Sequence, residues 1–409
     1  MIHKTPKDIV EITSKLQKYN DSYYINDIYL LIENSDCYDN SKKLYNFFTA
    51  NIMLIFYIYS FAILLIVNLL FTNNINYEKK IGFARVKRAK NKLINLYGNI
   101  QIIEDNIQSF NFTVFQIGSR LNRFKFIFKN YFRLCINDYL QIKKIVKNEF
   151  MKPYVNIVLF WCIKRIPHTV IYLNTIECII SNYKLKTIYT GHTYDRFAII
   201  EYTISQKYNK ILVCLPHGIE RTDKLPVGFV GDYFLCSSQN MSNTLNILYN
   251  TKKYIFNETI IKKLYNINNS YHNENYKLNK VVFFTQPIEV EKIKKIILFI
   301  SLYLKNERKL YIKVHPREKK QDYNFDNIEF IDDFNDAIFN NLCISFSSTI
   351  LLEALYNDSV SLSVIHLVLS DSLLSGRYEF LNDSRIIKPN NSQELLDFIE
   401  NYFESANVN

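Results

Sequence analysis

The chain has 409 residues, too many for one ordinary hydrophobic core and enough for two domains of typical size. Hydrophobic residues make up 48% of it and aromatic residues 15%, which excludes a disordered chain. The net charge of +11 predicts an anionic partner. The seven cysteines are scattered without a CxxC pair, which indicates a reducing compartment and no zinc site.

Residues 1–44 form a polar N-terminal segment, in which 25–34 has the apolar character of a first strand. The next segment, 45–97, contains an uncharged apolar run at 52–71 whose length is sufficient to cross a bilayer as a helix. The densest basic run of the chain follows directly, and this arrangement favours a membrane surface over nucleic acid; its members are Lys79, Lys80, Arg85, Lys87, Arg88, Lys90 and Lys92.

The sequence allows two interpretations of the apolar run. A spanning helix would place the large C-terminal part in the cytoplasm, because the basic residues lie on that side. A buried helix of the N-terminal domain is the alternative. If 25–34 is a strand of the following sheet, the run must lie in the membrane interface or turn back, because a bilayer cannot separate a strand from its sheet.

The segment 98–250 predicts an N-terminal Rossmann-like domain, with 25–34 as a candidate further strand. It begins with a strand at 100–104 and a basic amphipathic stretch at 116–134, followed by a long apolar helix. Strands and helices then alternate, which is typical of a parallel sheet covered by helices. The expected helices are 156–182, 195–208 and 238–248, and the expected strands are 186–190, 210–215 and 232–236.

A connector at 251–278 precedes a second Rossmann-like domain at 279–409. Its expected strands are 281–285, 310–314, 342–346 and 360–364, and its expected helices are 289–304, 334–341, 350–356 and 392–403. The fold class is therefore α/β, with two Rossmann-like domains facing across a cleft. Ligands in such sheets bind at the carboxyl ends of the strands.

Three turns at such strand ends could carry chemistry. His217 and Gly218 combine an imidazole with a residue that allows close backbone approach. A second turn gathers cationic groups suited to a phosphate, namely Lys313, His315 and Arg317. A third places hydroxyls and backbone N–H groups at a helix start, namely Ser347, Ser348 and Thr349. Taken alone, the first turn could hold a structural histidine, the second could be a solvated turn, and the third could be a helix cap.

The order of these motifs, HG, then KxHPR, then SST before a helix with Glu353, resembles that of metal-independent GT-B transferases of bacterial surface polysaccharides. That family includes sialyl- and polysialyltransferases and the CDP-glycerol transferases of teichoic acid synthesis. The resemblance covers about residues 186–400. It implies that His315, Ser347 and Ser348 contact the donor phosphate, with Lys313, Arg317 and Thr349 beside them. It also implies that His217 is the base toward the acceptor hydroxyl.

One feature of that family is missing. The sialyltransferases carry an acidic pair followed by Gly as their base motif, and the sequence contains no such triplet. Glu220 or Asp195 could substitute for it, and Glu353 is a candidate contact to the nucleotide or its ribose. The Asp332-Asp333 pair is better explained as a helix start than as a metal site.

The resemblance implies a membrane-associated glycosyltransferase of capsular polysaccharide synthesis, polysialic acid included, at the cytoplasmic face of the bacterial inner membrane. The donor would be CMP-sialic acid or another nucleotide sugar, and the acceptor a lipid-linked or oligosaccharide hydroxyl, with no cofactor and no metal. Further expected partners are anionic inner-membrane lipids and a capsule biosynthesis complex, but not nucleic acid. The alternative is a non-catalytic membrane scaffold of a polymerase or export complex with a degenerate transferase fold.

Overall fold

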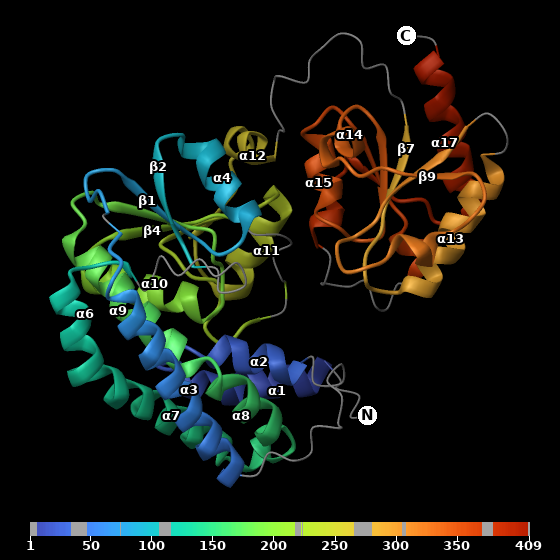
Figure 1. Ribbon diagram of the computed structural model, residues 1–409. Coiled ribbons are helices and arrows are strands. Elements are labelled where there is room, and N and C mark those ends of the chain that lie inside the picture. The colour runs from blue at the N-terminus through green and yellow to red at the C-terminus, as the bar shows by residue number, and fades with distance from the viewer. Residues whose placement is uncertain are drawn as a thin grey trace. The chain divides into compact units, whose positions relative to one another are not determined.

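A computed structural model describes residues 6–33, 47–73, 75–105, 116–216, 222, 224–265, 280–304, 308–369 and 379–407. The chain forms two compact units (Figure 1). Each unit contains one six-stranded sheet in which every pairing is parallel. The predicted α/β class with two parallel sheets is therefore confirmed, whereas the cleft between the two domains stays a prediction.

The sheet of the first unit has the strand order β2-β1-β3-β4-β5-β6. Its strands are β1 (Lys80–Ala84), β2 (Ile100–Glu104), β3 (Thr187–Thr190), β4 (Ile211–Cys214), β5 (Tyr233–Leu235) and β6 (Tyr254–Ile255). The sheet extends beyond the predicted domain at both ends. β1 lies within the segment 45–97 that the sequence assigned to membrane association, and β6 lies within the predicted connector.

Helices surround this sheet in the first unit. They are α1 (Pro6–Leu16), α2 (Ile25–Glu33), α3 (Phe47–Asn68), α4 (Lys87–Tyr97), α6 (Arg120–Phe126), α7 (Phe132–Val146), α8 (Val155–Ile163), α9 (Ile166–Asn182) and α10 (Arg196–Lys207). Shorter turns are η1 (Gln17–Tyr19), the π-helical η5 (Ile127–Tyr131) and η6 (Glu149–Tyr154).

Two expectations for these helices were wrong. Residues 25–34 were expected to form a strand, but Ile25–Glu33 form helix α2, because Ile25, Ile28 and Ile32 recur at helical spacing and are all buried. The apolar run 156–182 was expected to be one helix, but it is divided into α8 and α9. The second helix has Pro167 in its first turn, where the missing N–H costs nothing, whereas a proline within a continuous helix would break it.

Helix α3 holds most of the apolar run. Over Ala50–Asn68 it is long and apolar enough to cross a membrane. Nevertheless one stripe of the helix packs into the first unit, at positions three or four residues apart, as expected for one side of a helix. The buried members of the stripe are Ala50, Leu54, Ile58, Ala62 and Leu65.

The second unit has the strand order β12-β11-β10-β7-β8-β9, so β7 and β10 lie at its centre. Its strands are β7 (Val281–Phe284), β8 (Leu310–Lys313), β9 (Ile328–Phe330), β10 (Leu342–Ser345), β11 (Val360–Ser363) and β12 (Ile386–Ile387). All residues of β7 and β10 are buried, as expected for central strands that helices cover on both faces. The sequence predicted these central strands and missed the short edge strands β9 and β12.

The helices of the second unit begin before its first strand and then alternate with its strands. They are α11 (Gln239–Tyr249), α12 (Glu258–Tyr265), α13 (Val290–Tyr303), α14 (Phe334–Ile338), α15 (Ile350–Leu355), α16 (Ile365–Val368) and α17 (Ser392–Asn407), with the turns η8 (Lys320–Tyr323) and η10 (Glu379–Asn382). Helix α12 lies within the predicted connector, which is thus partly helical.

Candidate functional site

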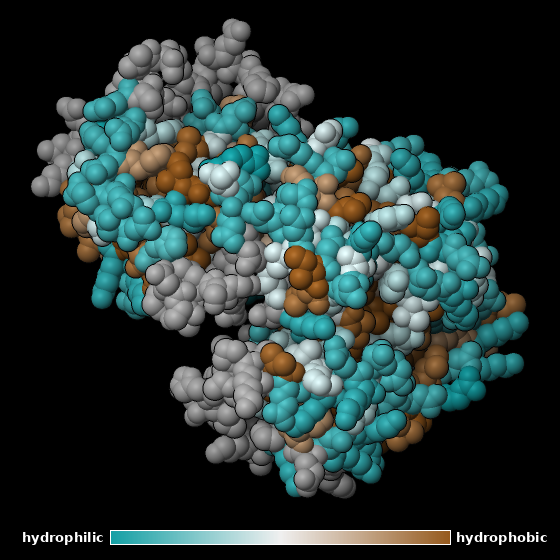
Figure 2. Space-filling view, turned by 180° about the vertical axis from the view of Figure 1, so that it is seen from behind, coloured by the Kyte–Doolittle hydropathy of each residue, from teal (hydrophilic) through white to brown (hydrophobic). Residues whose placement is uncertain are grey.

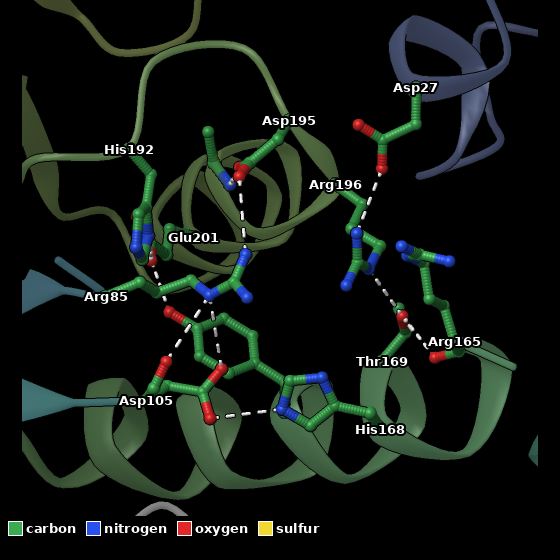
Figure 3. Close-up of polar contacts among 12 residues, drawn as sticks. Asp27, Arg85, Asp105, Arg165, His168, Thr169, His192, Asp195, Arg196 and Glu201 are labelled. Atoms are coloured by element: carbon green, nitrogen blue, oxygen red, sulfur yellow. Dashed lines mark hydrogen bonds and ion pairs between the residues drawn. The ribbon is translucent and has the colours of Figure 1, made fainter. Parts of the chain in front are cut away.

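Three polar side chains follow neighbouring strands of the first sheet, each directly at a carboxyl end. Arg85 follows β1, Asp105 follows β2, and His192 comes two residues after β3. Because β2, β1 and β3 are adjacent and parallel, these residues meet at one edge of the sheet (Figure 3). This is the edge at which open α/β sheets bind their ligands.

Asp105 is the centre of one group at this edge. Its Oδ1 lies 3.0 Å from Nε2 of His168 on α9, and the Nε–H of Arg85 donates to its backbone carbonyl over 3.3 Å. Burial alone would raise the pKa of Asp105, but His168 and Arg85 outweigh burial and lower it. Burial also lowers the pKa of His168, which Asp105 only partly offsets. The pair is therefore a carboxylate that accepts the N–H of a neutral imidazole.

A second group ties helix α2 to the same edge. The guanidinium of Arg196, in the first turn of α10, donates to Asp27 on α2 over 3.2 Å and to the hydroxyl of Thr169 over 3.0 Å. The guanidinium carbons of Arg85 and Arg196 each lie 4.1 Å from the ring centroid of the buried Phe197. These contacts fix the two guanidinium groups between the sheet edge and the start of α10.

His192 and Glu201 form the third group. The Nδ1 atom of His192 lies 2.6 Å from Oε1 of Glu201 on α10, and the hydroxyl of Tyr172 donates to the same oxygen. All three side chains are buried. Because Glu201 occupies Nδ1, the ring is oriented and Nε2 remains as its second functional atom. That Nε2 atom has no hydrogen-bond partner among the residues that the structure describes.

The electrostatics of His192 differ from those of His168. Burial by itself lowers the pKa of His192, but the Glu201 carboxylate outweighs it, so the net pKa lies above the ordinary value. A histidine whose pKa is raised by a carboxylate at Nδ1, with Nε2 unused, has the features of a general base. The buried Nε2 also requires a polar partner, because an unpaired buried polar group is costly.

At the carboxyl edge of the second sheet, Thr285 and Gln286 follow β7 and connect the two strands beside it. The Thr285 hydroxyl accepts the N–H of His315 over 2.9 Å and donates to Glu318 over 2.7 Å, on the β8 side. On the β10 side, the side-chain oxygen Oε1 of Gln286 accepts the backbone N–H of Ser347 over 2.8 Å. The predicted phosphate residues after β8 and β10 are therefore held at one edge through β7.

The tautomer of His315 follows from its contacts. Its Nδ1 accepts the backbone N–H of Arg317 over 3.2 Å, so the ring proton of the neutral form is on Nε2. Burial and the nearby Arg317 lower the pKa of His315, while Glu318 opposes them, and the net pKa lies below the ordinary value. His315 is thus a neutral N–H donor, a form that can donate to a phosphate oxygen without carrying charge.

Lys313 and Arg317 differ in their surroundings. The Lys313 ammonium donates to the backbone carbonyl of Asp332, which holds it beside β8. Arg317 is exposed, and its guanidinium makes no ion pair with any described residue. Lys313 keeps its charge as well, because a backbone carbonyl is neutral, but Arg317 is the more exposed of the two cations.

The predicted hydroxyl cluster after β10 is more enclosed than expected. Ser347 is buried, and its N–H, expected to be free, is taken by Gln286. The Ser348 hydroxyl accepts the N–H of Ile350 over 3.3 Å, and Thr349 is buried at the start of α15. Glu353, a candidate nucleotide contact, is buried within α15.

The acceptor half predicted from the sequence lies partly outside the described residues, because both His217 and Glu220 fall there. Asp195, the other candidate carboxylate, N-caps α10 by accepting the N–H of Ala198 over 3.0 Å. Asp333 likewise N-caps α14, as the sequence predicted for the Asp332-Asp333 pair.

Sequence reasoning missed the cluster at the edge of the first sheet. A signal for His192 existed, because Gly191-His192 directly follows an apolar strand. Nothing in the sequence pairs it with Glu201, which is nine residues further on and on the buried side of an otherwise ordinary helix. Arg85 was hidden because β1 was not foreseen as a strand, and Asp105, at the end of the predicted strand 100–104, had no visible partner without β1.

No family model matches the chain, and no curated protein matches its sequence. Among solved structures, UDP-GlcNAc 2-epimerase from Neisseria meningitidis is 12% identical, with 81% of this chain and 94% of that chain covered and a TM-score of 0.43. A glycosyltransferase from Rickettsia africae is 11% identical, with 81% and 89% covered and a TM-score of 0.42. The calicheamicin glycosyltransferase is 9% identical, with 80% and 90% covered and a TM-score of 0.44.

Proposed function

We propose that this chain is a glycosyltransferase that moves a sugar from a nucleotide-activated donor to an acceptor hydroxyl. The observation that carries the proposal is the His192–Glu201 pair, a candidate base in place of the acidic base motif that the sequence lacks. Neutral His192 would take the hydroxyl proton at Nε2 as the acceptor oxygen forms its bond to the anomeric carbon. Glu201 would stabilise the imidazolium that results.

The second sheet would bind the leaving nucleotide. As the bond between the anomeric carbon and the donor oxygen breaks, negative charge develops on the phosphate. His315 would donate its Nε2–H to that phosphate and Arg317 would supply a positive charge, whereas Ser348 would contribute a hydroxyl. Held in place before the reaction, such donors are worth about 3 kcal/mol each in favourable cases. No metal enters this scheme.

The finer assignment rests on the sequence resemblance. We place the reaction in bacterial surface-polysaccharide synthesis at the cytoplasmic face of the inner membrane. The donor would be CMP-sialic acid or another nucleotide sugar, and the acceptor a lipid-linked or oligosaccharide hydroxyl. The +11 net charge is consistent with anionic ligands and anionic lipids.

The test measures donor binding and transfer separately. Full-length protein is titrated with CMP- and UDP-linked sugars, and transfer to acceptors in washed membranes is followed with labelled donor. We expect His192→Gln to retain donor binding and to lower the transfer rate by about 10²- to 10⁴-fold. The matched control is Tyr172→Phe, which removes the other hydrogen bond to the same Glu201 oxygen and should retain most activity.

On the donor side, Arg317→Gln is compared with Lys319→Gln, an equal charge change two residues away on the same exposed loop. We expect Arg317→Gln to weaken donor binding about tenfold or more, as for loss of a charged hydrogen bond, and Lys319→Gln to change it little. Donor binding without any transfer would contradict the proposed reaction and favour the scaffold. Full transfer by His192→Gln together with loss in His217→Gln would assign the base to His217.

A further inference from the structure

The first unit exposes large apolar side chains on two helical stretches, α3 and the region from α6 through α7. On α3, Phe56 is 65% exposed and Ile63 is 61% exposed. We call the following exposed residues the α3/α7 face: Ile52, Ile55, Phe56, Tyr59, Ile63, Ile66, Val67, Leu70, Phe71, Leu121, Phe124, Phe128, Ile136 and Leu140. From behind, Figure 2 shows apolar side chains emerging between polar ones at the lower right.

The charged residues around this face are almost all basic. Helix α3 has no charged residue, and the stretch 116–148 has a single carboxylate, Asp138, which is buried. The basic residues of that stretch are Arg120, Arg123, Lys125, Lys129, Arg133, Lys143, Lys144 and Lys147. An apolar face bordered by lysine and arginine is complementary to a bilayer surface that exposes acyl chains between anionic headgroups.

Hydrogen bonds join helix α3 to the stretch 116–148 at the start, the middle and the end of the helix. The Tyr139 hydroxyl donates to Asn51 over 2.6 Å, and the Tyr131 hydroxyl donates to the Ile58 carbonyl over 2.9 Å. Arg123 donates to the carbonyls of Asn68 and Phe71 over 2.7 and 2.6 Å. The last bonds satisfy carbonyls that the C-terminal turn of a helix leaves open.

These bonds decide between the two ways in which α3 could meet a membrane. If α3 crossed the bilayer in this structure, α6 and α7 would enter it as well. The exposed Lys125 of α6 and Lys129 of η5 lie between the contacts of Arg123 and Tyr131 with α3. They would then lie at hydrocarbon depth, where each charge costs about 3 kcal/mol or more. A helix that lies along the surface avoids this cost, because its apolar side enters the interface while the basic side chains reach the headgroups.

We propose that the α3/α7 face is a monotopic docking surface for an anionic bilayer, with α3 parallel to the membrane plane. This inference deepens the membrane association within the proposed function, but it concerns attachment alone. It therefore stands or falls independently of donor binding and transfer. The bilayer is identified by its chemistry, an apolar layer covered by anionic headgroups.

The first experiment measures sedimentation of the full-length protein with vesicles of phosphatidylcholine alone or of phosphatidylcholine mixed with anionic phosphatidylglycerol. Binding should require the anionic lipid and weaken with salt. Replacing Lys125 and Lys129 by Glu should weaken it by about 30-fold or more, since each basic residue near the surface contributes about 1 kcal/mol. The control pair, Lys262→Glu with Lys263→Glu, changes two exposed lysines of α12 equally and should leave binding unchanged.

The apolar part is tested with Phe56→Ser and Ile63→Ser, against Ile247→Ser, which is 82% exposed on α11. Only the first two should reduce vesicle binding. Membrane-bound protein should be released by an alkaline carbonate wash. Retention after that wash would overturn the proposal in favour of a spanning helix. Absence of vesicle binding, with a dimer that Phe56→Ser dissociates, would overturn it in favour of a second copy of the chain.

Discussion

The carboxyl of Asp138 on α7 makes the stability of the first unit depend on pH. Asp138 is buried and accepts the hydroxyl of Tyr24 over 3.0 Å. Burial raises its pKa from 3.8 to about 7, against a smaller lowering by Tyr24. The folded state therefore holds this proton between pH 4 and pH 7, where the unfolded chain has already lost it. Stability that the protonated carboxyl provides is fully present below about pH 4 and is lost as the pH rises to 7.

The magnitude follows from that pKa difference. A rise of about three pKa units, at about 1.4 kcal/mol each, corresponds to about 4 kcal/mol across the window. Asp138→Asn keeps the shape and an acceptor for Tyr24 but cannot ionise. The free energy of unfolding of the Asn variant minus that of wild type should therefore increase steadily from pH 4 to pH 7 and stay constant above pH 7.

The assay is urea unfolding of both proteins at half-unit steps from pH 4.5 to pH 8.5, with the difference taken at each pH. Asp326→Asn, an exposed carboxylate without a charged partner among the described residues, is the control and should show a flat difference. A flat difference for Asp138→Asn as well would refute the reasoning, because it would mean that Asp138 is ionised in the folded protein throughout.

Three further outcomes are expected. If His192 is the base, the transfer rate falls at acidic pH with a pKa above the ordinary histidine value. Glu201→Gln should shift this fall in rate to lower pH, because it removes the carboxylate that raises the pKa of His192. An unchanged pH profile in Glu201→Gln would exclude the His192–Glu201 pair as the base. Gly191→Ala would bring a Cβ within 2.6 Å of the Ala89 Cβ and should cost about 1–3 kcal/mol in thermal unfolding. Asp333→Ala removes the N-cap that accepts two N–H groups and should destabilise the second unit by about 1 kcal/mol in urea unfolding.

The sequence by itself determined the α/β class and nearly all of the central strands. Apolar runs such as 281–285 and 342–346 alternate with helices of regular length, and this local pattern is enough to predict a buried parallel strand. The helix start at Asp333 was equally readable, because a cap depends only on residues a few positions away.

Only the tertiary structure decided where β1, α2 and α3 belong. An apolar, low-polarity segment of 20 residues satisfies the requirements of a membrane span and of a half-buried helix alike, and the choice depends on partners 50 or more residues away. The same holds for the polar cluster of the first unit. His192 meets Glu201 because helix α10 packs beside the turn that follows β3. Arg85 meets Asp105 because the parallel strands β1 and β2 bring their carboxyl ends to one edge. Such contacts depend on strand order, which local sequence patterns do not encode.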